Sequence, residues 1–300
     1  MARRFTILDV FAERPLAGNQ LAVVHDSDGL DGARMQAIAA EFGFSETVFL
    51  APARNAAHSA CVRIFTPKSE LPFAGHPTVG AAVAVARQDG IEGLGQGIVV
   101  LEEGVGPVRC GVVFGEGRAE AQFDLPRLPE PTPLPAPREV IATALGLAPT
   151  EIGFENHEAT AFEAGLPYTL VPVKNLAVAG RAAPVMAHWT DAFGPGPHAC
   201  AYVYCRETVN HAAQFHARMF APADGIPEDP ATGSAVACFA GALTRFDAPV
   251  DGLHTVRVEQ GVEMGRPSLI TLELDIEDGT LAGGRIGGNV VTVASGELQL

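Results

Sequence analysis

The sequence of the chain repeats one pattern in its two halves. Residues 63–67 read RIFTP and residues 218–222 read RMFAP, while residues 76–84 read HPTVGAAVA and residues 229–237 read DPATGSAVA. The second long copy begins 153 residues after the first, about half of the 300-residue chain. Two related halves predict two similar domains, and ligands favour the cleft where two domains meet. The difference inside the repeat, His76 in one copy and Asp229 in the other, therefore indicates where the chemistry lies.

Composition limits the class of protein and of partner. Hydrophobic residues make up 47% of the chain and charged residues 18%, with 33 glycines and 23 prolines, which predicts a turn-rich globular fold with many strands. The net charge of −15 argues against a nucleic-acid partner. Five cysteines without a dense framework predict reduced thiols in a cytoplasmic protein. No membrane partner is expected, because the longest apolar runs are too short to span a bilayer and the N-terminus carries no signal-peptide pattern.

Hydrophobic periodicity outlines the elements. Strands are expected at residues 5–11, 21–24, 45–50, 61–65, 98–102, 108–113, 119–123, 170–173, 201–204 and 216–220, with further paired strands after residue 257. Asp31 and Gly43 frame one helix, and small, alanine-rich helices are expected at residues 77–88 and from Pro230 onward. Residues 126–137 hold six prolines in twelve positions and are expected to form a linker rather than a strand or a helix.

In each half a polar residue is followed by a proline and a small-residue helix. Asp229 before Pro230 is also typical of a helix N-cap with proline at the first helical position, so capping is its alternative role. Small residues allow two helix N-termini to approach one ligand closely, and their free N–H groups favour an anion such as a carboxylate. His76 is not a favoured capping residue, and the titration of histidine near neutral pH suits a proton shuttle.

Glu46 opens a strand whose same face continues with Val48 and Leu50. A carboxylate at a strand start is ordinarily a solvated edge residue, but burial in a closed cleft would make it a competent general acid or base. Ser234 lies in the first turn of the second small helix and is expected to bind substrate rather than to attack it, because no base is evident beside it. The sequence motifs for dinucleotides, nucleoside triphosphates and zinc are absent, so neither a cofactor nor a metal is expected.

Longer motifs resemble one known family. The matching segments run in order along nearly the whole chain, at residues 9–11 (DVF), 18–19 (GN), 45–47 (SET), 63–67 (RIFTP), 73–78 (FAGHPT) and 225–234 (GIPEDPATGS). Together they are similar to those of the PhzF family, the phenazine-biosynthesis isomerase-like proteins. The resemblance implies an α+β fold of the diaminopimelate epimerase type, with two pseudo-symmetric domains, each a curved, mostly antiparallel sheet around a central helix. The C-terminal strands of the family cross back, so the expected domains are residues 1–125 with about 288–300, and residues 126–287.

The resemblance also implies an active site between the domains. Glu46 matches the glutamate that the family's isomerase uses, and the other functional positions of the family match further residues of this chain. These are His76 and Asp229 as catalytic residues, and Ser45, Gly75, Gly233 and Ser234 as substrate-binding residues. Related racemases use two cysteines, and no cysteine precedes either small helix here, which argues against two-thiol chemistry. Members of the family often form homodimers, so a homodimer is expected.

The function expected from the sequence is that of a cofactor-independent isomerase acting on a small carboxylate or amino-carboxylate. Glu46 moves a proton between two carbons, while His76 and Asp229 bind amino or hydroxyl groups and help to move protons. Ser234, Gly75 and the helix N-termini hold the carboxylate. Two alternatives stay open at this point: an amino-acid racemase or epimerase with a second base opposite Glu46, and a non-enzymatic binding protein on the same fold.

Overall fold

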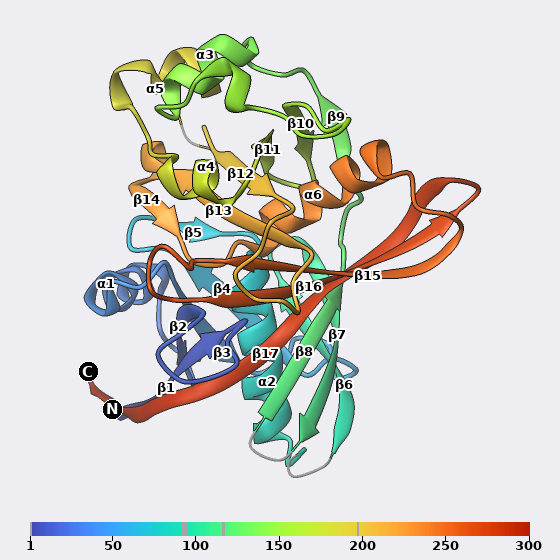
Figure 1. The fold of residues 1–300 in the computed structure, drawn as a ribbon. Coiled ribbons are helices and arrows are strands. Elements are labelled where there is room, and N and C mark those ends of the chain that lie inside the picture. Colours follow the sequence, from blue (N-terminus) through green and yellow to red (C-terminus); the bar gives the residue numbers. More distant parts are fainter. Residues whose placement is uncertain (1, 92–94, 116–117, 197) are drawn as a thin grey trace. The chain divides into compact units, whose positions relative to one another are not determined.

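The computed structural model of the protein describes residues 2–91, 95–115, 118–196 and 198–300. The chain divides into two compact units, one formed by residues 1–126 and 287–300 and the other by residues 127–286. They are called unit 1 and unit 2 below. Each unit contains strands and helices of its own, and each has one long helix that lies against a curved sheet (Figure 1).

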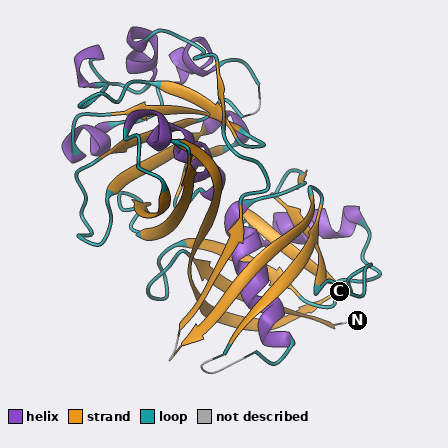
Figure 2. Cartoon of the chain, turned by 90° about the vertical axis from the view of Figure 1, so that its right-hand side faces the viewer, coloured by secondary structure: helices purple, strands orange, loops and turns teal. Residues whose placement is uncertain are grey.

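Unit 1 is a sheet that closes around one helix. Its elements are β1 (Ala2–Val10), β2 (Asn19–Val24), α1 (Gly32–Phe42), β3 (Glu46–Ala51), β4 (Ala60–Phe65), β5 (Glu70–Leu71), α2 (Gly75–Gln88), β6 (Gln96–Glu103), β7 (Gly106–Gly115), β8 (Arg118–Asp124) and the second half of β17 (Thr280–Gln299). Strand β1 pairs with β2 and β17, and β17 also pairs with β8. The remaining pairs β2–β3, β3–β4, β4–β6, β6–β7 and β7–β8 complete the ring, which surrounds α2 (Figure 2).

The small residues of α2 follow from this enclosure. Every residue of the helix from Gly75 to Ala86 is buried, so no side of it faces solvent. A Cβ added at Gly80 would lie 2.4 Å from Leu21 Cδ2 and 3.1 Å from Val10 Cγ2, which is closer than packed atoms allow. The run of Gly, Ala and Val is therefore what allows the strands to approach the helix on all sides.

Unit 2 contains a sheet, one long helix and a layer of short helices. Its elements are β9 (Glu130–Thr132), α3 (Arg138–Ala144), β10 (Thr160–Glu163), β11 (Pro167–Pro172), α4 (Leu176–Arg181), α5 (Met186–Phe193), β12 (Ala201–Cys205), β13 (Phe215–Ala221), β14 (Ile226–Asp229), α6 (Gly233–Phe246), β15 (Gly252–Gln260), β16 (Ser268–Glu277) and the first half of β17, with 3₁₀ turns at Pro149–Glu151 and Pro222–Asp224. The short helices α3, α4 and α5 form a buried apolar cluster with β11, β12 and β13, in which Trp189 is among the largest fully buried side chains.

Strand pairing repeats between the units. In unit 1, β2 and β3 are parallel, β3 and β4 antiparallel, β4 and β6 parallel, and β6 and β7 antiparallel. In unit 2, the pairs β11–β12, β12–β13, β13–β15 and β15–β16 follow the same order of directions. Helix α2 stands between β5 and β6 as α6 stands between β14 and β15. The repeated sequence motifs thus occupy equivalent places in two copies of one topology.

The proline-rich segment differs from its prediction. It was expected to be a linker without strand or helix, but it contains β9, which pairs antiparallel with β10 through Pro131 and Phe162. Proline is tolerated in an edge strand because its missing N–H is not needed on the unpaired side. By contrast, the helix expected after Asp31 is confirmed: Asp31 Oδ1 accepts a hydrogen bond from Arg34 N at 2.8 Å, and Gly43 ends α1 with φ of 66°.

Gly287 is expected to be essential for closing the sheet of unit 1. A Cβ at this position of β17 would lie 2.6 Å from the Ala121 carbonyl oxygen of β8. Gly287→Val should therefore lower the free energy of unfolding by about 1–3 kcal/mol, the usual cost of overpacking. Gly283→Val in the same strand is the matched control, because its nearest neighbour, Asp275 Cβ, is 3.7 Å away. Chemical denaturation of both variants checks this, and equal stability of the two would contradict the close approach.

No helix within the described residues is both long enough and apolar enough to cross a membrane.

Candidate functional site

Glu46 and His76 meet at the start of α2 in unit 1. Glu46 is the first residue of β3, and His76 is the second residue of α2, so strand pairing and helix start bring together two positions 30 residues apart. His76 Nε2 lies 3.5 Å from Glu46 Oε2, and both side chains are largely buried. A carboxylate and an imidazole in this arrangement can share the movement of a proton to and from a bound molecule. Gly75 directly precedes His76, and Ser45 directly precedes Glu46.

Asn19 and Gln20, at the start of β2, both contact the His76 ring. Asn19 Nδ2 lies 3.2 Å from His76 Nδ1, and the Gln20 backbone also hydrogen-bonds the ring. Because an amide NH₂ group donates and a backbone carbonyl accepts, the two contacts favour different tautomers of the neutral ring. Together they orient the ring, whose Nε2 faces Glu46.

His76 does not titrate near neutral pH, contrary to the expectation from its residue type. Burial of the ring lowers the pKa of His76 to about 3, since the imidazolium would lose its hydration there. Glu46 therefore faces a neutral imidazole rather than a cation at physiological pH. A neutral imidazole of this kind polarises or hydrogen-bonds a substrate group instead of carrying a full charge to it.

The loop between β1 and β2 is built to place Asn19. Buried Asp9 accepts a hydrogen bond from Leu16 N at 2.6 Å through Oδ2, which ties the loop back to β1. Gly18 has φ of 67°, and an added Cβ would lie 2.3 Å from the Val10 carbonyl oxygen, so only glycine fits this turn. The motif residues Asp9, Gly18 and Asn19 thus act together on the orientation of His76. Asn19 was absent from the residues predicted for the site, although it stands in one of the quoted motifs.

A second buried carboxyl group lies beside the first turns of α2. Thr78 Oγ1 lies 2.8 Å from both the Ala74 carbonyl oxygen and Glu103 Oε1. Thr78 Oγ1 donates to Glu103 Oε1, and the Ala74 carbonyl oxygen also accepts a hydrogen bond from Thr78 N at 3.1 Å. Burial raises the pKa of Glu103 to about 8, against the opposing effect of the hydrogen bond from Thr78. This pKa favours the neutral carboxyl group at pH 7, and no local sequence pattern indicates it.

Asp229 is held in unit 2 by hydrogen bonds from two directions. Thr232 Oγ1 donates to Asp229 Oδ2 at 2.5 Å, and Gln260 Nε2 donates to the Asp229 carbonyl oxygen at 2.8 Å. Gln260 also accepts a hydrogen bond from Thr232 N at 3.3 Å. Ser268 Oγ donates to the carbonyl oxygen of Pro230 at 2.8 Å, so the segment between β14 and α6 is fixed on several sides. Thr232 and Gln260 were not predicted, and Gln260 carries no signal in the sequence.

The alternative interpretation of Asp229 as a helix cap is wrong, and the predicted start of the second small helix at Pro230 is also wrong. Asp229 is the last residue of β14, and α6 begins at Gly233 rather than at Pro230. The N-cap residue is Thr232, whose side chain bonds Asp229 and makes no capping hydrogen bond. Tertiary contacts override the local preference of the Asp-Pro pair here.

Both central helices begin without a side-chain cap. The N-cap of α2 is Ala74 and that of α6 is Thr232, and neither side chain accepts a hydrogen bond from the first turn. Each helix is 14 residues long, so each N-terminus carries the full partial positive charge of a helix dipole. The predicted substrate-binding residues Gly75, Gly233 and Ser234 are all in these first turns. First-turn N–H groups of this kind are suited to an anionic group of a ligand.

Tyr168 orients Ser234. The two side-chain oxygens lie 2.7 Å apart, and Tyr168 is buried in β11. Burial raises the pKa of Tyr168 well above its ordinary value, so the phenol stays protonated and can donate to Ser234 Oγ. Of the predicted residues, the structure thus brings together Glu46 and His76 in unit 1, and Asp229, Gly233 and Ser234 in unit 2.

His76 is expected to remain neutral from pH 8 down to pH 5. Its pKa of about 3 lies below this window. Two-bond ¹H–¹⁵N NMR of the imidazole groups checks the charge state of the ring, and His76→Asn identifies the signal. A titration midpoint between pH 5 and 8 would contradict the expectation.

Among the described residues, no three His, Cys, Asp or Glu side chains converge closely enough to hold a metal ion.

Comparison with known proteins agrees with this architecture over the full length of the chain. The family model of phenazine biosynthesis-like proteins (PhzC-PhzF) matches residues 8–296. An uncharacterised isomerase of Mesorhizobium japonicum is 54% identical over 99% of this chain and 98% of its own. The trans-2,3-dihydro-3-hydroxyanthranilate isomerase of Pseudomonas chlororaphis is 32% identical over 99% of both chains.

A solved structure supports the same grouping. The crystal structure of a PhzF family phenazine biosynthesis protein from Bacillus anthracis superposes with a TM-score of 0.88, covers 100% of both chains and is 26% identical. The predicted α+β fold of the diaminopimelate epimerase type is confirmed. The chain belongs to the phenazine biosynthesis-like family, and its class of activity is that of an isomerase.

Proposed function

We propose that this protein isomerises a small unsaturated carboxylate or amino-carboxylate by moving a proton from one carbon to another. The observation that carries the proposal is the pairing of Glu46 with His76, 3.5 Å apart at the uncapped start of α2. The name of the Pseudomonas chlororaphis relative makes trans-2,3-dihydro-3-hydroxyanthranilate the first substrate to consider.

In this mechanism Glu46 removes a proton from the substrate carbon and returns it to another carbon. Negative charge then develops on the conjugated carboxylate of the substrate, and it must be met by donors that are already in place. The first-turn N–H groups of α2 and α6 supply such donors, with Ser234 Oγ held ready by Tyr168. The neutral imidazole of His76 hydrogen-bonds an amino or hydroxyl group of the substrate.

Asp229 is the second polar anchor in the proposal. Its carboxyl group is buried and accepts a hydrogen bond from Thr232. It binds the substrate's amino or hydroxyl group, and it needs a fixed orientation because proximity contributes only when the reacting groups are held in line. The hydrogen bonds from Thr232 and Gln260 supply that orientation.

The test is direct. Purified protein is incubated with trans-2,3-dihydro-3-hydroxyanthranilate, and the product is followed by liquid chromatography with mass spectrometry. The isomerase of Pseudomonas chlororaphis serves as the positive control. Conversion to an isomer of the same mass is the expected result. If the control converts the substrate and this protein converts neither it nor other small unsaturated amino-carboxylates, the proposal fails.

A further inference from the structure

An arginine and a glutamate form the same pair in both units. In unit 1, Arg63 Nε and Nη2 of β4 donate to Glu70 Oε1 and Oε2 of β5, each at 2.7 Å. In unit 2, Arg218 Nε and Nη2 of β13 donate to Glu228 Oε1 and Oε2 of β14, each at 2.8 Å. Each pair joins the two strands that directly precede a central helix. This shared bidentate contact explains why an arginine is repeated in the RIFTP and RMFAP motifs. A bidentate pair fixes the relative orientation of the two side chains as well as the distance between them.

The two pairs differ in burial. Arg63 and Glu70 have side chains that are 34% and 44% exposed, whereas those of Arg218 and Glu228 are 8% and 17% exposed. An exposed pair contributes little to rigidity, because water competes for both groups. A buried pair has few alternative partners, and losing either member leaves a desolvated charge. The pair in unit 2 is therefore the one expected to fix the positions of the two strands that it joins, β13 and β14.

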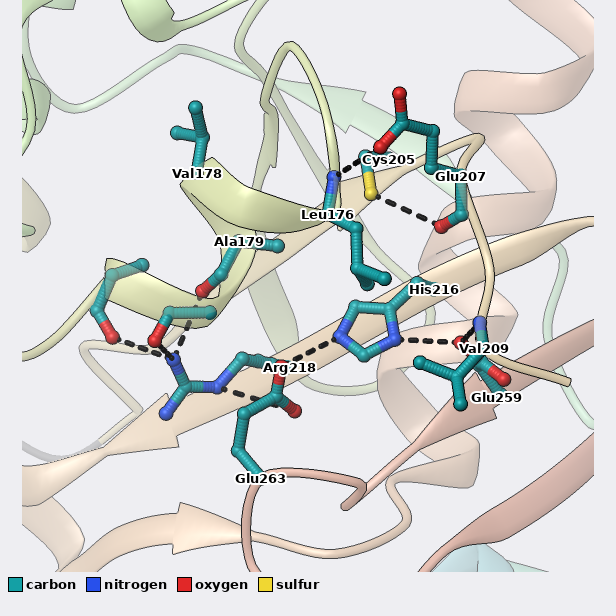
Figure 3. Close-up of polar contacts among 12 residues, drawn as sticks. Leu176, Val178, Ala179, Cys205, Glu207, Val209, His216, Arg218, Glu259 and Glu263 are labelled. Carbon is teal, nitrogen blue, oxygen red and sulfur yellow. Dashed lines mark hydrogen bonds and ion pairs between the residues drawn. The ribbon is translucent and has the colours of Figure 1, made fainter.

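Arg218 is anchored on its remaining side by the end of α4. Its Nη1 donates to the carbonyl oxygen of Ala179 at 2.9 Å (Figure 3). It also donates to the carbonyl oxygens of Ala182 at 2.7 Å and Gly180 at 3.3 Å. These carbonyls belong to the last turn of the helix and the residue after it, where i→i+4 partners are missing; of the three, the Ala179 carbonyl oxygen also accepts from Ala182 N at 3.2 Å. The guanidinium thus bridges a helix end and a strand, and its position does not depend on Glu228 alone.

Glu263 links this arginine to His216. Glu263 Oε2 lies 3.8 Å from Arg218 Nε, and Glu263 Oε1 lies 3.0 Å from His216 Nε2 (Figure 3). His216 Nδ1 is 2.8 Å from Glu259 Oε1, so both ring nitrogens donate and the ring is an imidazolium. The two glutamates raise the pKa of His216 to about 9 against the opposing effect of burial. Three carboxylates and two cations therefore form one continuous network across β13, β14, β15 and the turn that follows β15.

Glu228 is the neighbour of Asp229 in β14. Successive side chains of a strand point to opposite faces, so fixing Glu228 on one face fixes the direction of Asp229 on the other. Asp229 is also paired in the sheet with Met219, the residue after Arg218. We propose that Arg218 and Glu228 are positioning residues that aim the Asp229 carboxyl group at the substrate. This inference rests on the proposed function, in which Asp229 contacts the substrate.

The test uses two conservative variants and one matched control. Glu228→Gln removes the charge but keeps the shape, and Arg218→Lys keeps the charge but loses the two-pronged contact. Glu70→Gln makes the same change in the exposed pair of unit 1. With trans-2,3-dihydro-3-hydroxyanthranilate as substrate, both unit 2 variants are expected to lower kcat about 10- to 100-fold with KM within about threefold, since misplacing a reacting group costs on this order. Glu70→Gln should stay within about twofold.

A double variant separates positioning from general loss of structure. If Glu228 acts through Asp229, then Glu228→Gln combined with Asp229→Asn should be no slower than Asp229→Asn alone, within about threefold. Additive losses, or a kcat of Glu228→Gln within threefold of the unaltered protein, would overturn the inference.

Amide hydrogen exchange makes the outcome independent of the substrate. Peptides covering residues 226–234 should exchange at least tenfold faster in Glu228→Gln than in Glu70→Gln, because the segment loses one of its anchors. If the unaltered protein fails to turn over the substrate, the proposed function fails while this comparison still decides about the pair. Unchanged exchange in that segment would overturn the positioning role.

Discussion

Replacing Glu46 with Gln is expected to lower kcat by about 10²- to 10⁴-fold, the range over which a positioned general base or acid contributes. The amide has nearly the same shape as the carboxyl group but cannot take up a proton from carbon. His76 cannot replace it as the base, because burial lowers the pKa of the ring to about 3 and so makes it a weak base. The loss should therefore fall on kcat, measured by steady-state turnover of the substrate, with a smaller change in KM.

Glu41→Gln is the matched control for this experiment. Glu41 lies on α1 of the same unit and is exposed, so the same chemical change is made away from the start of α2. Its kcat should stay within about twofold of the unaltered protein, and circular dichroism should show that both variants are folded. A Glu46→Gln variant that keeps more than a tenth of the activity would exclude Glu46 as the proton-transferring group.

The second large effect is a loss of stability between pH 5 and pH 9 that depends on Glu103. In the folded protein burial raises the pKa of this carboxyl group to about 8, whereas in the unfolded chain it titrates near 4.5. The folded state therefore binds one more proton than the unfolded state between these two values. The free energy of unfolding should fall as the pH rises through this window, by about 5 kcal/mol over the full range.

Glu103→Gln should remove this dependence. The amide does not titrate, and its oxygen accepts the hydrogen bond from Thr78 Oγ1 at every pH. The stability of Glu103→Gln minus that of the unaltered protein, measured by urea denaturation, should therefore rise steadily from pH 5 to pH 9. Taking this difference cancels the contributions of His76 and His216, which also have shifted pKa values.

Glu102→Gln, at the adjacent position, is the control with the opposite sign. The backbone N–H groups of Asn55 and Arg54 lower the pKa of Glu102 to about 2. Its contribution is fully present above pH 4.5 and is lost only as the pH falls toward 2. His58 Nδ1 lies 3.0 Å from Glu102 Oε1, so the comparison is made with His58→Gln in both proteins, and the two should then differ by a constant amount between pH 5 and 9. A Glu103→Gln difference that is equally flat would show that Glu103 is ionised in the folded protein.

Elements with strong local signals could be predicted from the sequence. Helix α1 is specified by a cap at Asp31, an apolar face and a left-handed glycine at residue 43. The repeat of small residues after His76 and after Asp229 correctly indicated two equivalent helices, because close packing against strands admits little else. Glu46 and His76 could be named from motifs, and the structure places them in contact.

Features that depend on distant partners could not be predicted. The Asp-Pro pair at residues 229–230 is typical of a helix start, but Gln260, about 30 residues later, and Thr232 hold Asp229 in a strand instead. The segment with six prolines forms β9 because an edge of β10 was available to pair with it. Glu103 and Tyr168 carry no local pattern, and their protonation depends on burial that only the folded chain creates.

The central claim, proton transfer between carbons by Glu46, is tested most directly by following a labelled proton. Trans-2,3-dihydro-3-hydroxyanthranilate carrying deuterium at the carbon that loses its proton is converted in H₂O, and unlabelled substrate is converted in D₂O, with products read by mass spectrometry and NMR. In H₂O, the account predicts that the deuterium moves to one other carbon of the product or is lost to solvent. In D₂O, it predicts that any deuterium gained from solvent appears at that same carbon. Transfer and exchange should both stop in Glu46→Gln and continue in Glu41→Gln. Product formation by Glu46→Gln at the rate of the unaltered protein would contradict it.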